Sequence, residues 1–154
     1  MMTFFTYDWW KSLQTPTPQA NPALDYKLHL GRIRKHLTSE LLRLEEGISL
    51  HDGFLRRLRL DVAAGRMEMT IDLDDWDKPP CAVQLLYGAV SIVESTAPRN
   101  DILGGQFGFG QLGYLETDVT DGGFEHRILF SSGVELRIAF GGFHLKLGKK
   151  PNNG

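Results

Sequence analysis

The stretch 124–140 reads Phe-Glu-His-Arg-Ile-Leu-Phe-Ser-Ser-Gly-Val-Glu-Leu-Arg-Ile-Ala-Phe. Apolar side chains occupy alternate positions on both sides of Ser131-Ser132-Gly133, a pattern typical of two antiparallel strands joined by a tight turn. Because successive residues of a strand point to opposite faces, one face of this hairpin carries only apolar side chains and His126. The stretch therefore predicts an antiparallel sheet with one buried face.

Weaker forms of the same pattern extend the sheet in both directions. Residues 54–62 and 67–73 alternate around a short turn and predict a second hairpin with one wet face. The run 81–95 is apolar almost throughout and predicts a central strand, with a buried helix as the alternative. Two further strands are expected around 106–117 and 143–147.

Helical signals precede the strands. Residues 1–21 predict a short helix and a Pro-rich linker. Residues 22–47 predict a long helix, because leucine and isoleucine recur at spacings of three and four. Helices followed by strands favour an α+β fold, with an N-terminal helix or helices before a curved antiparallel sheet of about six or seven strands over 54–148. We expect this sheet to pack on the long helix within a single domain, 1–154.

Composition excludes several classes of protein. The 17 Lys and Arg and 19 Asp and Glu give a formal charge of −2, with no strongly basic segment, so nucleic-acid binding is not expected. No run of 18 apolar residues exists, so a membrane span is not expected. Cys81 is the only cysteine, and the apolar start Met1–Trp10 lacks the basic region of a secretion signal. These features predict a cytoplasmic protein.

Glycine is the residue type that departs most from average composition. Twelve of the 17 glycines lie from Gly104 onward. The segment Gly108–Gly113 matches G-x-G-x-x-G, but a dinucleotide site needs a helix after the motif, and the residues that follow read as a strand. Most late glycines fall at expected turns, bulges or kinks, such as Gly141-Gly142, which is what a curved antiparallel sheet requires.

Four aspartates crowd positions 72–77 around Trp76. Their carboxylates are suitable ligands for calcium or magnesium, but the spacing departs from the EF-hand pattern. The alternative is an acidic hairpin end that pairs with arginines 56, 57 or 59 across the strands. The five histidines show no zinc-binding spacing. We expect neither a metal nor a cofactor.

The candidate ligand-binding residues are His51, Asp52, His126 and Arg137. His51-Asp52 precedes the first strand, where Asp52-Gly53 also suits an ordinary turn and His51 suits the end of the preceding helix. His126 lies on an apolar strand face, where a histidine is more often a core residue than a ligand. No residue is assigned a catalytic role, and we expect a protein that is not an enzyme.

The order of a long helix, then Ile48-Ser49-Leu50-His51-Asp52-Gly53-Phe54-Leu55, then Asp61 and the strand Met67–Leu73 resembles a loose class of small bacterial proteins. In that class a Leu-His-Asp-small residue step opens an antiparallel sheet. Some members are classed as immunity proteins of toxin systems, and most have no assigned activity. The resemblance implies a non-enzymatic binding protein.

Two functions therefore remain open. The first is binding to a protein partner or to a second copy, for which Phe4, Phe5, Trp9, Trp10 and Trp76 offer aromatic surface, although at least half of these are expected to be ordinary core residues. The second is a small-ligand protein or enzyme whose pocket inside the curved sheet gathers the four candidate residues.

Overall fold

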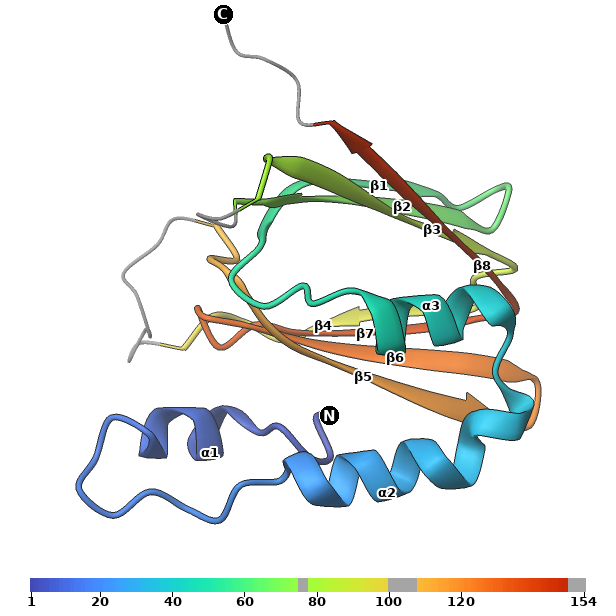
Figure 1. Ribbon diagram of the computed structural model, residues 1–154. Coiled ribbons are helices and arrows are strands. Elements are labelled where there is room, and N and C mark those ends of the chain that lie inside the picture. The colour runs from blue at the N-terminus through green and yellow to red at the C-terminus, as the bar shows by residue number, and fades with distance from the viewer. Residues whose placement is uncertain (75–77, 100–107, 150–154) are drawn as a thin grey trace, which may run out of the picture.

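A computed structural model describes residues 1–74, 78–99 and 108–149. Over these residues the chain is α+β, with short helices and two antiparallel sheets stacked face to face (Figure 1). Sheet A has the strand order β1-β2-β3-β8, and sheet B has the order β4-β7-β6-β5. The strands are β1 (Phe54–Asp61), β2 (Arg66–Leu73), β3 (Cys81–Gly88), β4 (Ile92–Ser95), β5 (Leu112–Thr120), β6 (Gly123–Phe130), β7 (Glu135–Phe140) and β8 (Gly142–Lys149).

The single curved sheet of six or seven strands is thus replaced by a sandwich of two four-stranded sheets. The chain passes between sheets where the run 81–95 breaks after Gly88, with Ala89 at φ +48°, and again at Gly141. The apolar face of each sheet is buried by the other sheet, so no long helix is needed to cover it. The predicted kink at Gly141-Gly142 is therefore a step from one sheet to the other.

The expected helix over 22–47 is also divided. The structure has α2 (Ala23–Ile33), a short 3₁₀ turn η1 (Arg34–His36) and α3 (Ser39–Gly47), besides α1 (Tyr7–Ser12) near the N-terminus. The break follows from Thr38, whose hydroxyl accepts the Leu41 N–H at 3.3 Å and starts a new helix. No helix within the described residues is long and apolar enough to cross a membrane.

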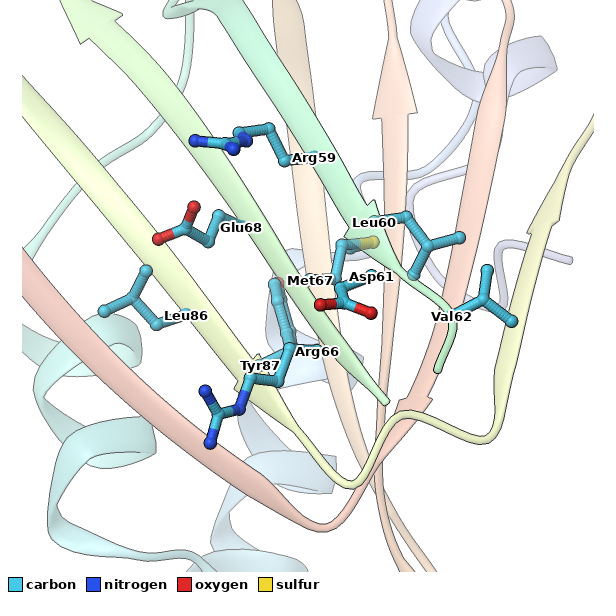
Figure 2. Close-up of a pocket in the computed structure, with 9 residues that line it drawn as sticks. All are labelled: Arg59, Leu60, Asp61, Val62, Arg66, Met67, Glu68, Leu86 and Tyr87. Atoms are coloured by element: carbon cyan, nitrogen blue, oxygen red, sulfur yellow. The ribbon is translucent and has the colours of Figure 1, made fainter. Parts of the chain in front are cut away.

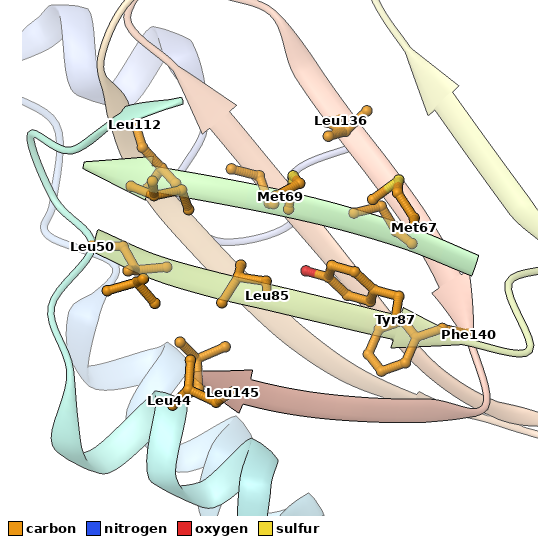
Figure 3. Close-up of a cluster of buried hydrophobic side chains, with 14 of the residues drawn as sticks. Leu44, Leu50, Met67, Met69, Leu85, Tyr87, Leu112, Leu136, Phe140 and Leu145 are labelled. Carbon is orange, nitrogen blue, oxygen red and sulfur yellow. The ribbon is translucent and has the colours of Figure 1, made fainter. Parts of the chain in front are cut away.

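The main core lies between the two sheets, and α3 closes one side of it. Figure 3 shows Leu44 of α3 beside Leu145 of β8, with residues of both sheets around them. Arg43 of α3 donates to the Leu145 carbonyl of the β8 edge at 3.3 Å. No long helix among the described residues covers a sheet: the short helix α3 packs against β8 of sheet A, and α2 packs against β5 of sheet B.

A second, smaller core covers the outer face of sheet B. Residues 2–12, which include α1 and are called the N-terminal cover below, lie with α2 beneath this sheet (Figure 1). Phe5 stacks on Tyr114 of β5 at a centroid distance of 4.7 Å, and Trp9 contacts the same ring. Phe5 and Trp9 are buried, so these two aromatics are core residues and offer no interface. Trp76 lies outside the described residues.

Candidate functional site

The His51-Asp52 step forms a tight turn between α3 and β1. His51 Nδ1 lies 2.7 Å from the Gly113 carbonyl oxygen, so this nitrogen carries the proton and donates. Nε2 lies 3.5 Å from Asp52 Oδ1, a contact that becomes an ion pair when the imidazole is protonated. Asp52 has a φ of +65°, a conformation that asparagine and aspartate tolerate better than most residues. The turn therefore presents an imidazole of defined orientation beside a carboxylate.

Two hollows flank this turn. One, of about 500 Å³, has polar lining from Ser49, His51, Asp52, Asp74, Lys78 and Cys81. The other, of about 230 Å³, lies where His51 and Glu45 face Tyr114. Burial raises the pKa of Glu45, although hydrogen bonds from Thr117 and Tyr26 counter this shift. The volume of the larger hollow falls in the range of small-molecule sites, roughly 300–1,000 Å³.

His126 lies elsewhere, in the core between the sheets. Its side chain is fully buried, Nδ1 lies 2.8 Å from the Tyr87 hydroxyl, and the rings of Phe140 and Phe143 surround it. Burial, with a smaller effect of the Arg127 charge, lowers the pKa of His126 to about 3, so the imidazole is neutral at pH 7. Nε2 has no hydrogen-bond partner among the described residues.

Arg137 occupies the outer face of sheet B. Its guanidinium makes two hydrogen bonds to Glu94, at 2.9 and 2.8 Å, and one to Glu125 at 2.7 Å. These bonds raise the pKa of Arg137 further above its usual value. Arg137 and His126 are on opposite faces of the sheet, since His126 pairs with Ile138. The structure therefore brings His51 and Asp52 together but joins neither His126 nor Arg137 to them.

A buried carboxylate that the sequence reasoning missed holds the N-terminal cover. Glu116 of β5 is fully buried and accepts the backbone N–H groups of Thr3, Phe4 and Phe5 at 2.9, 2.7 and 2.8 Å. It also accepts from Arg127 Nε on the neighbouring strand at 3.0 Å. The signal that could have indicated Glu116 was the placement of acidic and basic residues at alternate positions of adjacent strands. The N-terminal partners of Glu116, however, are distant from it in sequence.

Strand β1 is an edge of sheet A. Leu58 and Leu60 pair with Met69 and Met67, whose side chains are buried, so all four point to the core side of the sheet. Leu58 and Leu60 nevertheless remain 37% and 43% exposed, and Val62 just after the strand is 81% exposed. Within the described part of the chain, β1 packs extensively only against β2.

A hollow of about 700 Å³ lies at the same end of β1. Arg59, Leu60, Asp61 and Val62 line one side, and residues of β2 and β3 line the rest (Figure 2). Arg59 makes no ion pair among the described residues, while Asp61 Oδ1 accepts the Ala64 N–H at 3.0 Å. A docking site for another chain is made of free backbone groups on an edge strand, exposed apolar side chains and accessible charges.

No cluster of three metal-binding side chains exists within the described ranges. Of the predicted acidic group, Asp75 and Asp77 lie outside those ranges. Asp72 pairs with Arg56 Nε at 3.1 Å, which is the ion pair across strands that the sequence offered as the alternative to a metal site.

Comparison of the chain with protein-family models, with curated proteins and with solved structures found no significant match.

Proposed function

We propose that this protein is a non-enzymatic binding domain whose partner is a protein segment paired with the free edge of β1. The observation that carries the proposal is the exposure of Leu58 and Leu60 on an edge strand and of Val62 just after it. Exposed edge strands pair readily with other chains, and natural proteins usually protect them with charges, bulges or covering segments. The first residue of β1, Phe54, is bridged to Gln111, and a bulge lies between Leu55 and Arg57. Beyond the bulge Leu58 and Leu60 remain exposed, and an added strand would bury them.

The resemblance of the His51-Asp52 step to small bacterial proteins, some classed as immunity proteins of toxin systems, also favours a protein partner. That resemblance implies a non-enzymatic binding protein. A single cysteine supports a cytoplasmic location as part of the same proposal.

The test is selection of peptides from a random display library on the protein immobilised at low density. We expect extended apolar peptides to be enriched by the wild type and lost with Leu60→Lys, because an ammonium group would then enter the buried side of the added strand. Leu24→Lys is the matched control, since Leu24 lies on α2 and is 66% exposed. Peptides that bind the wild type and Leu60→Lys equally, or no enriched peptides, would contradict the proposal.

A second candidate is a small-ligand site in the hollow of about 500 Å³ beside His51 and Asp52. The observation that favours it is the convergence of imidazole, carboxylate, thiol and ammonium groups on an apolar wall. Thermal-shift screening with small carboxylic acids, amines, sugars and nucleotides tests it. A compound that raises Tm for the wild type and for His36→Ala, but not for His51→Ala, supports the site. A screen without such a compound removes this candidate.

A further inference from the structure

Strand β1 carries a pattern of side chains that is complementary to itself. In a pair of antiparallel strands related by a two-fold axis, the numbers of facing residues add to a constant. With the axis at Leu60, residue 59 faces residue 61 of the other copy, and residue 58 faces residue 62. From this pattern we infer that the segment docking on β1 is the β1 strand of a second copy of this chain, an inference that rests on the proposed function.

The charges select this register. Arg59 faces Asp61 of the second copy, and Asp61 faces Arg59, so two ion pairs form on the outer face. An axis at Leu58 would instead oppose Arg57 and Arg59, and an axis at Arg59 would oppose two copies of Arg59. Directly opposed like charges destabilise a strand pair. Among these three registers, only the axis at Leu60 pairs opposite charges without opposing like ones.

The apolar side chains match in the same register. Leu60 faces Leu60 on the core side of sheet A. Leu58 comes opposite Val62, which belongs to the turn just after β1. Leu58 and Leu60 of β1 and Val62 just after it have exposed fractions of 37%, 43% and 81%, and Phe54 at the other end of the strand is 42% exposed. An added strand would bury Leu58 and Leu60. A hollow of about 700 Å³ lies beside them, lined by residues of β1, β2 and β3 (Figure 2).

The layout of the sandwich agrees with a partner at this side. At the opposite edge of sheet A, β8 is covered by α3, which packs against it and donates from Arg43 to its backbone. At β1, no described helix takes that role. A second β1 strand would supply both the backbone partners and the apolar cover, and would join two copies of sheet A into one continuous sheet.

The experiment measures mass in solution by size-exclusion chromatography with light scattering, across protein concentrations from about 1 to 100 μM, the range of moderate self-association. We expect the wild type to have twice the 17.3 kDa of one chain at the upper end. Leu60→Lys and Arg59→Asp should weaken the dimer by about tenfold or more, because each places like charges across the axis. Leu24→Lys should leave it unchanged.

A charge exchange tests the register itself. The double variant Arg59→Asp/Asp61→Arg restores opposite charges across the axis at Leu60, so it should recover the dimer that Arg59→Asp loses. Hydrogen exchange on the wild type provides a measurement that needs no variant: amides within residues 59–61, which face strand residues of the second copy, should gain protection as the concentration rises.

A wild type that stays monomeric at 100 μM, or a dimer that Leu60→Lys and Arg59→Asp leave intact, overturns the inference. So does a double variant that stays as weak as Arg59→Asp. If the chain is monomeric yet still selects peptides that depend on Leu60, the proposed function stands and only the second copy is rejected. If it is monomeric and selects no peptides, both are rejected.

Discussion

Replacement of Glu116 by glutamine tests how the N-terminal cover is held. One carboxylate receives four N–H donors: those of Phe4 and Phe5 reach Oε1, while those of Thr3 and Arg127 reach Oε2. In Glu116→Gln one of these oxygens becomes an NH₂ group, so whichever way the amide turns, two donors face another donor. The side chain is fully buried, and water cannot replace the lost acceptor.

The size of the effect follows from those two lost bonds. Hydrogen bonds to a charged group contribute about 1.5–3 kcal/mol each, so the free energy of unfolding should fall by about 3–6 kcal/mol. For a chain of this length, a loss of that size lowers Tm by at least about 6 °C. Because the contacts tie the cover to sheet B, the cover should detach before the sheets unfold.

Urea unfolding followed by two signals distinguishes these steps. Trp9 and Trp10, two of the three tryptophans, belong to the cover, so their part of the tryptophan fluorescence should report its detachment, whereas far-UV circular dichroism reports the sheets. In Glu116→Gln the fluorescence transition should precede the circular-dichroism transition. Glu94→Gln is the matched control, since the same change there affects only an exposed ion pair with Arg137. If both variants shift the urea midpoint equally, or Glu116→Gln leaves it unchanged, the reasoning is refuted.

Three further variants test the core and the backbone. Burial lowers the pKa of His126 to about 3, whereas the imidazole of the unfolded chain titrates near 6.5. Between these pH values the unfolded chain binds one more proton than the folded chain. The free energy of unfolding therefore falls as the pH decreases, by up to about 1.4 kcal/mol per pH unit. His126→Leu should remove this part of the slope in urea titrations from pH 7 to pH 4, and an unchanged slope would contradict a buried neutral imidazole. Leu41→Ala should lower the free energy of unfolding by about 2–5 kcal/mol, since Leu41 is fully buried on α3. Leu24→Ala on the exposed face of α2 should have little effect. Equal urea midpoints for the two variants would disprove the role of α3 in the core. Gly53→Ala should destabilise the protein by roughly 1–3 kcal/mol, because its Cβ would lie 2.7 Å from a buried side-chain carbon. Gly31→Ala should raise Tm, because no atom lies within 4 Å of the added Cβ. The opposite order of the two Tm changes would be inconsistent with the packing around the turn.

The parts of the fold that depend on neighbours in sequence were predictable. The hairpin of β6 and β7 follows from its alternation, and Gly133 has the positive φ, +84°, that its turn needs. The α+β class and the short helix within residues 1–21 are likewise present. The division of the strands into two sheets was not predictable in the same way, because alternation shows that one face is buried but leaves open what buries it.

The candidate site shows the same boundary. His51 and Asp52 are adjacent in sequence, and the turn holds them together. Arg137 could have been separated from His126 at the outset, since the alternation of the predicted hairpin already places them on opposite faces. The exposure of Leu58 and Leu60 could not have been predicted, because β1 has the alternation of a half-buried strand. Only the arrangement of the sheets places β1 at an uncovered edge.

The anchoring of the N-terminal cover by Glu116 also has a consequence for biosynthesis. Phe5 and its acceptor are separated by 111 residues, so the aromatic start leaves the ribosome long before the strand that receives it. At about 5–20 residues per second, that interval lasts roughly 6–22 s. During this time Phe5 and Trp9 have no sheet to cover, and the nascent chain presents an apolar segment that chaperones recognise. The N-terminal cover thus waits for β5 to be translated before it reaches these native contacts.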